Sequence, residues 1–171
     1  MRHVVLAALA LTGCGDVTPA SSVSRVYGDT TRNASLAEYT HAFQLATGIE
    51  VTVPVILVSE AEREMQVADA TTAGVCTQWV KGVGGAVVML RADYWASAGV
   101  NERWVLIQHE LGHCLLGLDH RDELDPNGCA VSVMRYEIGN ASDCLDEGRV
   151  SPLAYLEELT GSVEIVRRDL R

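Results

Sequence analysis

The distribution of apolar and polar residues divides the first half of the chain into a helix followed by three strands. Residues 35–46 are predicted to form the helix, because Ser35 is a suitable N-cap and Gly48 lies just past the end. The polar residues 60–69 fit a short helix or a loop, and the glycines of residues 81–84 indicate a flexible hairpin connection. Apolar runs predict strands at residues 51–58, 74–80 and 85–90.

A further helix is predicted to carry the most informative motif of the chain. Asn101 is its candidate N-cap, followed by the acidic Glu102 and the apolar residues 104–107. Gly117 is the residue best able to end this helix in a left-handed conformation and to reverse the chain. Three of the five histidines of the chain therefore lie on this helix and just after its end.

Residues 109–120 have the sequence H-E-L-G-H-C-L-L-G-L-D-H. His109 and His113 are four residues apart, so on a helix they share one face at a separation of about 6 Å and can bind a single cation. Glu110 lies about 100° further round the helix, where it can reach a water on the metal but cannot easily be a third ligand. The spacing predicts a Zn²⁺ site with its general base. The alternative is a chance motif whose histidines are merely packed or solvated.

The motif resembles the signature of the metzincin clan of zinc endopeptidases, H-E-x-x-H-x-x-G-x-x-H followed by a methionine turn. One departure is present, because six residues rather than five separate His113 from the next histidine. The G-x-x-H spacing from Gly117 to His120 is kept, as in the matrixin branch, so we expect one additional helical residue and His120 as third ligand. The competing assignment makes Asp119 the third ligand and places Leu116 in the left-handed turn, where a leucine is strained.

A second element of the resemblance follows fourteen residues after His120. The segment S-V-M-R-Y at residues 132–136 is similar to the methionine turn, in which Met134 would form an apolar floor beneath the metal ligands. Tyr136 stands two residues later, where the astacin and serralysin branches carry a tyrosine. By that resemblance its hydroxyl binds the metal in the resting site or stabilises the oxyanion. The alternative is an interfacial tyrosine with a buried ring and a solvated hydroxyl.

The start of the chain indicates export. A short basic opening precedes the apolar residues 4–11, and Leu11-Thr12-Gly13-Cys14 resembles a bacterial lipobox. The sequence predicts a signal peptide at residues 1–13, a lipidated Cys14 with a linker to residue 34, and one zinc peptidase domain at residues 35–171. The protein would be anchored by lipid to a bacterial membrane on its periplasmic or cell-surface face. The alternative is an ordinary cleaved signal peptide.

Charge and cysteine content narrow the partners and the compartment. Removing residues 1–13 takes away Arg2 and changes the net charge from −10 to −11, which argues against nucleic-acid binding. Apart from Cys14, four cysteines remain, and in an exported domain they suggest two disulfides with three pairings open. We favour Cys129 with Cys144 and Cys76 with Cys114. A zinc-ligating Cys114 is disfavoured, because adjacent helix positions point about 100° apart.

The resemblance implies an α+β fold of the zincin type, with a small mixed twisted sheet, an active-site helix, a methionine turn and a C-terminal helix. The strand at residues 85–90 would form the cleft edge that binds an extended peptide. The C-terminal helix is predicted to start at Ser151-Pro152 and to end at Gly161. Its expected apolar face consists of Leu153, Leu156 and Leu159.

The function implied is a zinc endopeptidase that acts on protein or peptide substrates as a monomer. Glu110 would take a proton from the attacking water and deliver it to the leaving amine. The alternative is a non-catalytic lipoprotein of similar fold that uses zinc for stability or for partner binding. In that case a fourth ligand such as Asp119 or Asp122 would close the site.

Overall fold

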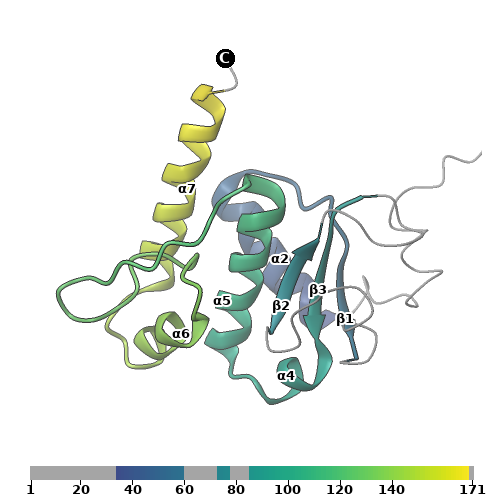
Figure 1. Ribbon diagram of the computed structural model, residues 1–171, viewed down its shortest axis with the longest axis horizontal. Coiled ribbons are helices and arrows are strands. Elements are labelled where there is room, and N and C mark those ends of the chain that lie inside the picture. The colour runs from purple at the N-terminus through teal and green to yellow at the C-terminus, as the bar shows by residue number, and fades with distance from the viewer. Residues whose placement is uncertain (1–33, 60–72, 78–84, 170–171) are drawn as a thin grey trace, which may run out of the picture.

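The computed structural model describes residues 34–59, 73–77 and 85–169, and the fold of these residues is α+β. These residues form five α-helices, one π-helical turn and a small mixed sheet, and Figure 1 shows how the helices lie around the sheet. In chain order the elements are α2 (Ala34–Thr47), β1 (Val55–Val58), β2 (Gly74–Thr77), β3 (Val87–Arg91), α4 (Ala92–Ser97), α5 (Val100–Leu111), η2 (Gly112–Leu116), α6 (Ile138–Asp146) and α7 (Pro152–Asp169). The predictions for the signal segment, Cys14, the linker to residue 33, residues 60–69 and the connection 81–84 lie outside the described residues.

The three strands form one sheet in the order β1-β3-β2. β1 and β3 are parallel, with Val55 opposite Val88, whereas β2 and β3 are antiparallel, with Gly74 opposite Leu90. Alternate side chains of β3 point to opposite faces of the sheet. Val88 and Leu90 pack into the main core with the helices, while Met89 belongs to a smaller cluster on the other face.

The strand expected at the cleft edge, residues 85–90, is instead the central strand, so this prediction is wrong. β3 pairs on both sides, and its residues 87–90 are fully buried. An unbroken apolar run suits a strand that is covered on both faces, and the sequence V-V-M-L has this character. Within the described residues β2 takes the outer position, and it is the strand that borders the site.

Helix α5 lies between the sheet and α6, and this central place buries most of its length (Figure 1). The apolar face that begins with Val105, Leu106 and Ile107 is completely enclosed. Helices α2 and α7 contribute Phe43, Tyr155 and Leu159 to the same core. The core therefore holds α5 from several sides, so that residues near its C-terminal end have fixed positions.

Two helix boundaries differ from the predictions. Helix α5 is capped by Gly99 rather than Asn101, because Glu102 reaches back and its Oε2 accepts a hydrogen bond from the Gly99 N–H at 3.2 Å. The Asn101 amide donates instead to Asp146 at the end of α6, at 2.8 Å. Helix α7 continues past Gly161, since a glycine inside a helix costs only about 1 kcal/mol and does not force an end.

The other boundaries are close to the predictions. Helix α2 ends before Gly48, which has the left-handed φ of 66°. Strand β1 begins later than expected, directly after Pro54, which has no N–H to donate to a strand ladder. The last turns of α7 extend away from the body of the molecule (Figure 1). Among the described helices none combines the length and hydrophobicity that crossing a bilayer requires.

Candidate metal centre

The helix that carries the histidines changes its winding before it ends. After Leu111 the α-helix continues as the π-helical turn η2, in which the Gly117 N–H donates to the Gly112 carbonyl five residues earlier. Gly117 then adopts a left-handed conformation with φ of 64° and ends the helix. A π turn holds one more residue than an α turn. The additional residue predicted before the turn is therefore present within the helix.

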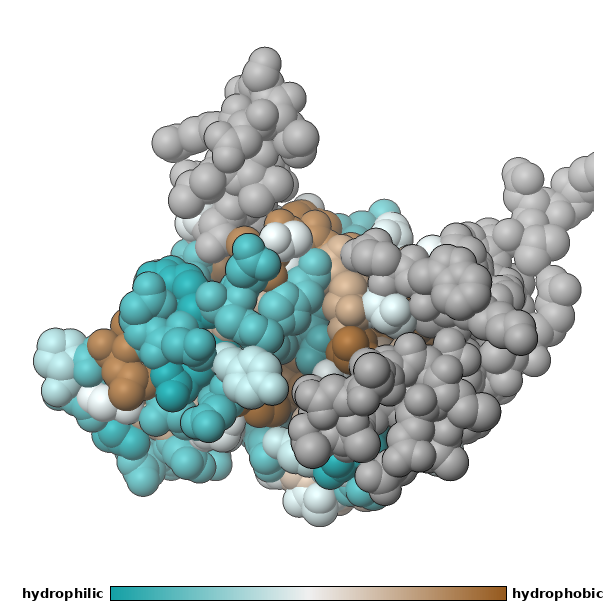
Figure 2. Space-filling model, in the orientation of Figure 1, coloured by the Kyte–Doolittle hydropathy of each residue, from teal (hydrophilic) through white to brown (hydrophobic). Residues whose placement is uncertain are grey.

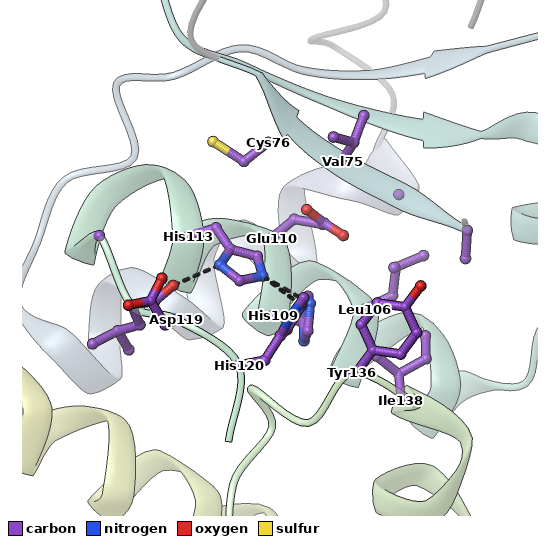
Figure 3. A pocket seen from close by; sticks show the side chains of 14 residues that line it. Val75, Cys76, Leu106, His109, Glu110, His113, Asp119, His120, Tyr136 and Ile138 are labelled. Carbon is purple, nitrogen blue, oxygen red and sulfur yellow. Dashed lines mark hydrogen bonds between the residues drawn. The ribbon is translucent and has the colours of Figure 1, made fainter. Parts of the chain in front are cut away.

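Three histidines gather at this point. Nitrogen atoms of His109, His113 and His120 all lie within 4.8 Å of one another, and Asp119 is not part of the group. The His113 Nε2 lies 3.0 Å from the His109 Nε2 and 3.2 Å from the His120 Nε2. Figure 3 shows the three imidazoles directed toward one another, with Glu110 on the side of β2.

Hydrogen bonds to the backbone fix the tautomers of two of these rings. The His109 Nδ1–H donates to the Val133 carbonyl at 2.8 Å, and the His113 Nδ1–H donates to the Leu118 carbonyl at 2.6 Å. With the proton on Nδ1, each Nε2 carries a lone pair and no hydrogen. Two facing lone pairs repel each other, so the short Nε2 separations favour a cation between them.

The dimensions and charges of this group fit Zn²⁺. Three nitrogens at about 2.0–2.1 Å from one tetrahedral Zn²⁺ would lie about 3.3–3.4 Å apart, close to the observed spacings. Burial lowers the pKa of His109 to about 4, against the opposing effect of its hydrogen bond to Val133. Burial also lowers the pKa of His113. Both rings are thus neutral near pH 7, which is the form that binds metals.

Glu110 is buried beside the histidines and faces β2. It is 4% exposed, and burial raises its pKa to about 8, opposed by a hydrogen bond from the backbone of Cys76. A Cβ built on Gly74 would lie 3.0 Å from the Glu110 Cγ and Oε1. The outer strand therefore passes close to the carboxylate because it has a glycine there. The sequence gives no local signal for this role of Gly74, which depends on contact between distant segments.

Met134 and Tyr136 contact different parts of the segment that carries the histidines. Met134 is 1% exposed and packs against Gly112, where a Cβ would approach its Sδ to 2.4 Å. Tyr136 is 58% exposed, and its ring centroid lies 5.1 Å from that of His120 in an edge contact. Asp122 accepts a hydrogen bond from the Tyr136 N–H at 3.0 Å. Asp122 therefore supports the loop after the turn and is not part of the three-histidine group.

A cavity of about 630 Å³ opens over the histidines. Figure 2 shows apolar residues along the middle of this face beside a larger hydrophilic area, and a separate apolar patch at the left edge. The histidines, Glu110 and Asp119 supply polar groups to the cavity, and apolar side chains form much of the remaining wall. A ligand would therefore contact both an apolar surface and a cluster of groups that can bind a metal or exchange protons. The lining also includes Val75 and Cys76 of β2, Leu106 of α5, and Ile138 of α6.

Two disulfides flank the centre, with the pairing favoured from the sequence. Cys76 is bonded to Cys114, which joins β2 to the π turn directly after His113. Cys129 is bonded to Cys144, which joins the loop before the methionine segment to α6. Because Cys114 is in a disulfide, it is not available as a thiolate ligand.

Comparisons with protein-family models, with curated proteins and with solved structures gave no match. The observations on the chain itself therefore carry the assignment. They establish an α+β fold with a three-histidine group that could hold a metal ion, at the end of a helix beside a mixed sheet.

Proposed function

We propose that this protein is a zinc-dependent endopeptidase of metzincin type. The observation that carries the proposal is the convergence of three Nε2 atoms beside the buried carboxylate of Glu110, within one cavity. This arrangement separates metal ligands from a base, as hydrolysis requires. The motif resemblance adds support, because Met134 packs against Gly112 of the ligand helix and Tyr136 contacts His120.

Each side chain has a defined part in the proposed reaction. The metal, when bound by His109, His113 and His120, supplies a Lewis acid that polarises the scissile carbonyl and lowers the pKa of a water. Glu110 takes a proton from the attacking water and passes it to the leaving nitrogen. Glu110 must be ionised to act as a base, and positive charge held at the three histidines would favour its carboxylate form. Tyr136 is proposed to donate a hydrogen bond to the developing oxyanion, and its ring contact with His120 supports this role.

The substrate is proposed to be an extended peptide that lies along β2. This strand is outermost in the described part of the sheet, and Gly74, Val75 and Cys76 line the cavity. Peptides commonly add to the edge of a sheet. The apolar wall formed by Leu106 and Ile138 suits an apolar substrate side chain, and the acidic chain disfavours nucleic acid.

The proposed location is the periplasmic or cell-surface face of a bacterial membrane, reached through a lipid on Cys14. The two disulfides support this location, because disulfides persist in oxidising compartments. The protein is proposed to act there as a monomer, with a lipid anchor and a single catalytic domain at residues 35–171.

Metal analysis together with peptide cleavage tests the function. The purified protein should bind about one Zn²⁺ and cleave casein or a quenched-peptide mixture, and a chelator should abolish cleavage. Glu110→Gln should retain zinc and lose turnover. Zinc binding without cleavage of any peptide would favour the alternative, a non-catalytic zinc protein. A structural zinc site is usually closed by a fourth protein ligand, whereas among the described residues the group consists of the three histidines.

A further inference from the structure

One carboxylate, from helix α7, contacts both the segment that carries His120 and the methionine segment at residues 132–136. Glu158 of α7 has a side chain that is 16% exposed. Its Oε1 accepts a hydrogen bond from the Arg121 guanidinium at 3.0 Å, and its Oε2 accepts one from the Ser132 hydroxyl at 2.9 Å. Arg121 directly follows the third histidine, and Ser132 opens the methionine segment. One side chain from a distant helix therefore bridges the two segments.

The same two segments are also bonded to each other and to His109. The fully buried Ser132 hydroxyl accepts a hydrogen bond from the Met134 N–H at 3.0 Å. The Arg121 N–H donates to the Met134 carbonyl at 2.9 Å. Between these contacts the Val133 carbonyl accepts a hydrogen bond from the His109 Nδ1–H. A shift of the methionine segment would thus move the acceptor that orients His109.

The third histidine lies outside the helices. His120 is exposed and lies after the end of the helix, in residues without regular secondary structure, where its ring contacts His113 and Tyr136. Its neighbour Arg121 is held by the backbone bond to Met134 and by two ion pairs, one with Glu158 at 3.0 Å and a longer one with the exposed Glu123 at 3.5 Å. Hydrogen bonds between charged groups are stronger than neutral ones, and partial burial reduces their screening by water.

We propose that Glu158 is a positioning residue of the metal centre. Its carboxylate fixes the segment of His120 relative to the segment that orients His109, and so keeps the three imidazoles at a spacing that binds a metal. The inference rests on the metal site of the proposed function but not on peptide cleavage. Residues that hold metal ligands in place typically change metal affinity by about 10- to 100-fold when they are substituted.

The chain offers a matched control in the preceding residue. Glu157 is exposed on the same helix, and the structure gives it no hydrogen bond or ion pair with any described residue. Glu158→Gln and Glu157→Gln remove the same charge from adjacent positions. Arg121→Gln, at a side chain that is 49% exposed, removes the ion pair from its other end with little risk to folding.

The test measures the release of Zn²⁺ from the full chain to a chromophoric chelator, together with the visible spectrum of the Co²⁺-loaded protein. Glu158→Gln should weaken zinc binding by about 10-fold or more and alter the cobalt spectrum, whereas Glu157→Gln should match the wild type. Arg121→Gln should act in the same direction. In the Glu158→Gln background, Arg121→Gln should weaken zinc binding less than it does in the wild type. The reason is that the Arg121–Glu158 ion pair is already lost there.

Two results would overturn the inference. Equal zinc release from the Glu158 and Glu157 variants would show that the carboxylate does not position the site. A lower melting temperature of the metal-free Glu158 variant with an unchanged cobalt spectrum would show a role in general stability alone. If the wild type binds zinc but cleaves no peptide, the proposed function fails while the inference on Glu158 stands.

Discussion

Gly112→Ala tests the packing beneath the metal centre most directly. Gly112 is the first residue of the π turn and is buried where the ligand helix meets the methionine segment. A Cβ at this position would lie 2.4 Å from the Met134 Sδ and 3.2 Å from its Cε. Met134 is 1% exposed, so its side chain has no open solvent into which it could move. The substitution adds one methyl group where the structure has no space.

Two opposing effects determine the sign of the change in stability. Alanine is favoured over glycine inside a helix by about 1 kcal/mol. Overpacking of a close-packed core costs about 1–3 kcal/mol, and a contact of 2.4 Å is far shorter than the optimal separation of about 3.5–4.0 Å between carbon atoms. The cost should therefore reach the upper part of that range. We expect a net loss of about 1–2 kcal/mol, which lowers the Tm by about 4–8 °C.

Thermal unfolding of the metal-free protein is the appropriate assay, because it separates packing from metal binding. A cycle with Met134→Ala identifies the cause. Met134→Ala alone should cost about 2–5 kcal/mol through the cavity that it leaves. Adding Gly112→Ala to it should then cost nothing or give a gain, because the new methyl group fills part of that cavity. An unchanged or higher Tm for Gly112→Ala in the wild-type background would refute the reasoning.

Three further predictions concern the ligands, the disulfide and the outer strand. In a zinc titration, His120→Ala should weaken binding by more than about 100-fold, whereas Asp119→Ala should stay within about twofold, and the reverse order would identify the aspartate as ligand. Cys76→Ser combined with Cys114→Ser opens a loop with a sequence separation of 38 and should lower the free energy of unfolding in urea by about 4 kcal/mol. Gly74→Ala should lower kcat at unchanged zinc content, because the new Cβ displaces the proposed base.

The parts of the site that local sequence determines could be predicted. His109 and His113 share a face because residues four apart on a helix point in nearly the same direction. Gly117 adopts the left-handed conformation, which glycine tolerates better than residues with a side chain. These relations involve only a few neighbouring residues. For the same reason the start of α7 at Pro152 could be predicted, since proline suits the first position of a helix.

The features that the sequence did not reveal depend on contacts between distant segments. Strand β3 pairs with residues of β1 that lie 33 positions earlier in the chain and with residues of β2 that lie 10–16 positions earlier, and an apolar run alone does not identify these neighbours. The bridging role of Glu158 requires α7 to pack below the methionine segment. The cap at Gly99 is a local exception, in which Glu102 bonds to the Gly99 N–H, while the better N-cap candidate Asn101 bonds to the distant Asp146.

The location of the additional residue explains why His120 rather than Asp119 joins the group. The π turn takes up this residue before Gly117, so the number of residues from the left-handed glycine to His120 is the one expected for the third ligand. The Asp119 assignment would need Leu116 in the left-handed conformation. Leu116 is instead 6% exposed within the π turn, and no described residue other than glycine has a positive φ. A leucine in that conformation would be strained and would leave the core, so the chain gains by widening the helix by one residue.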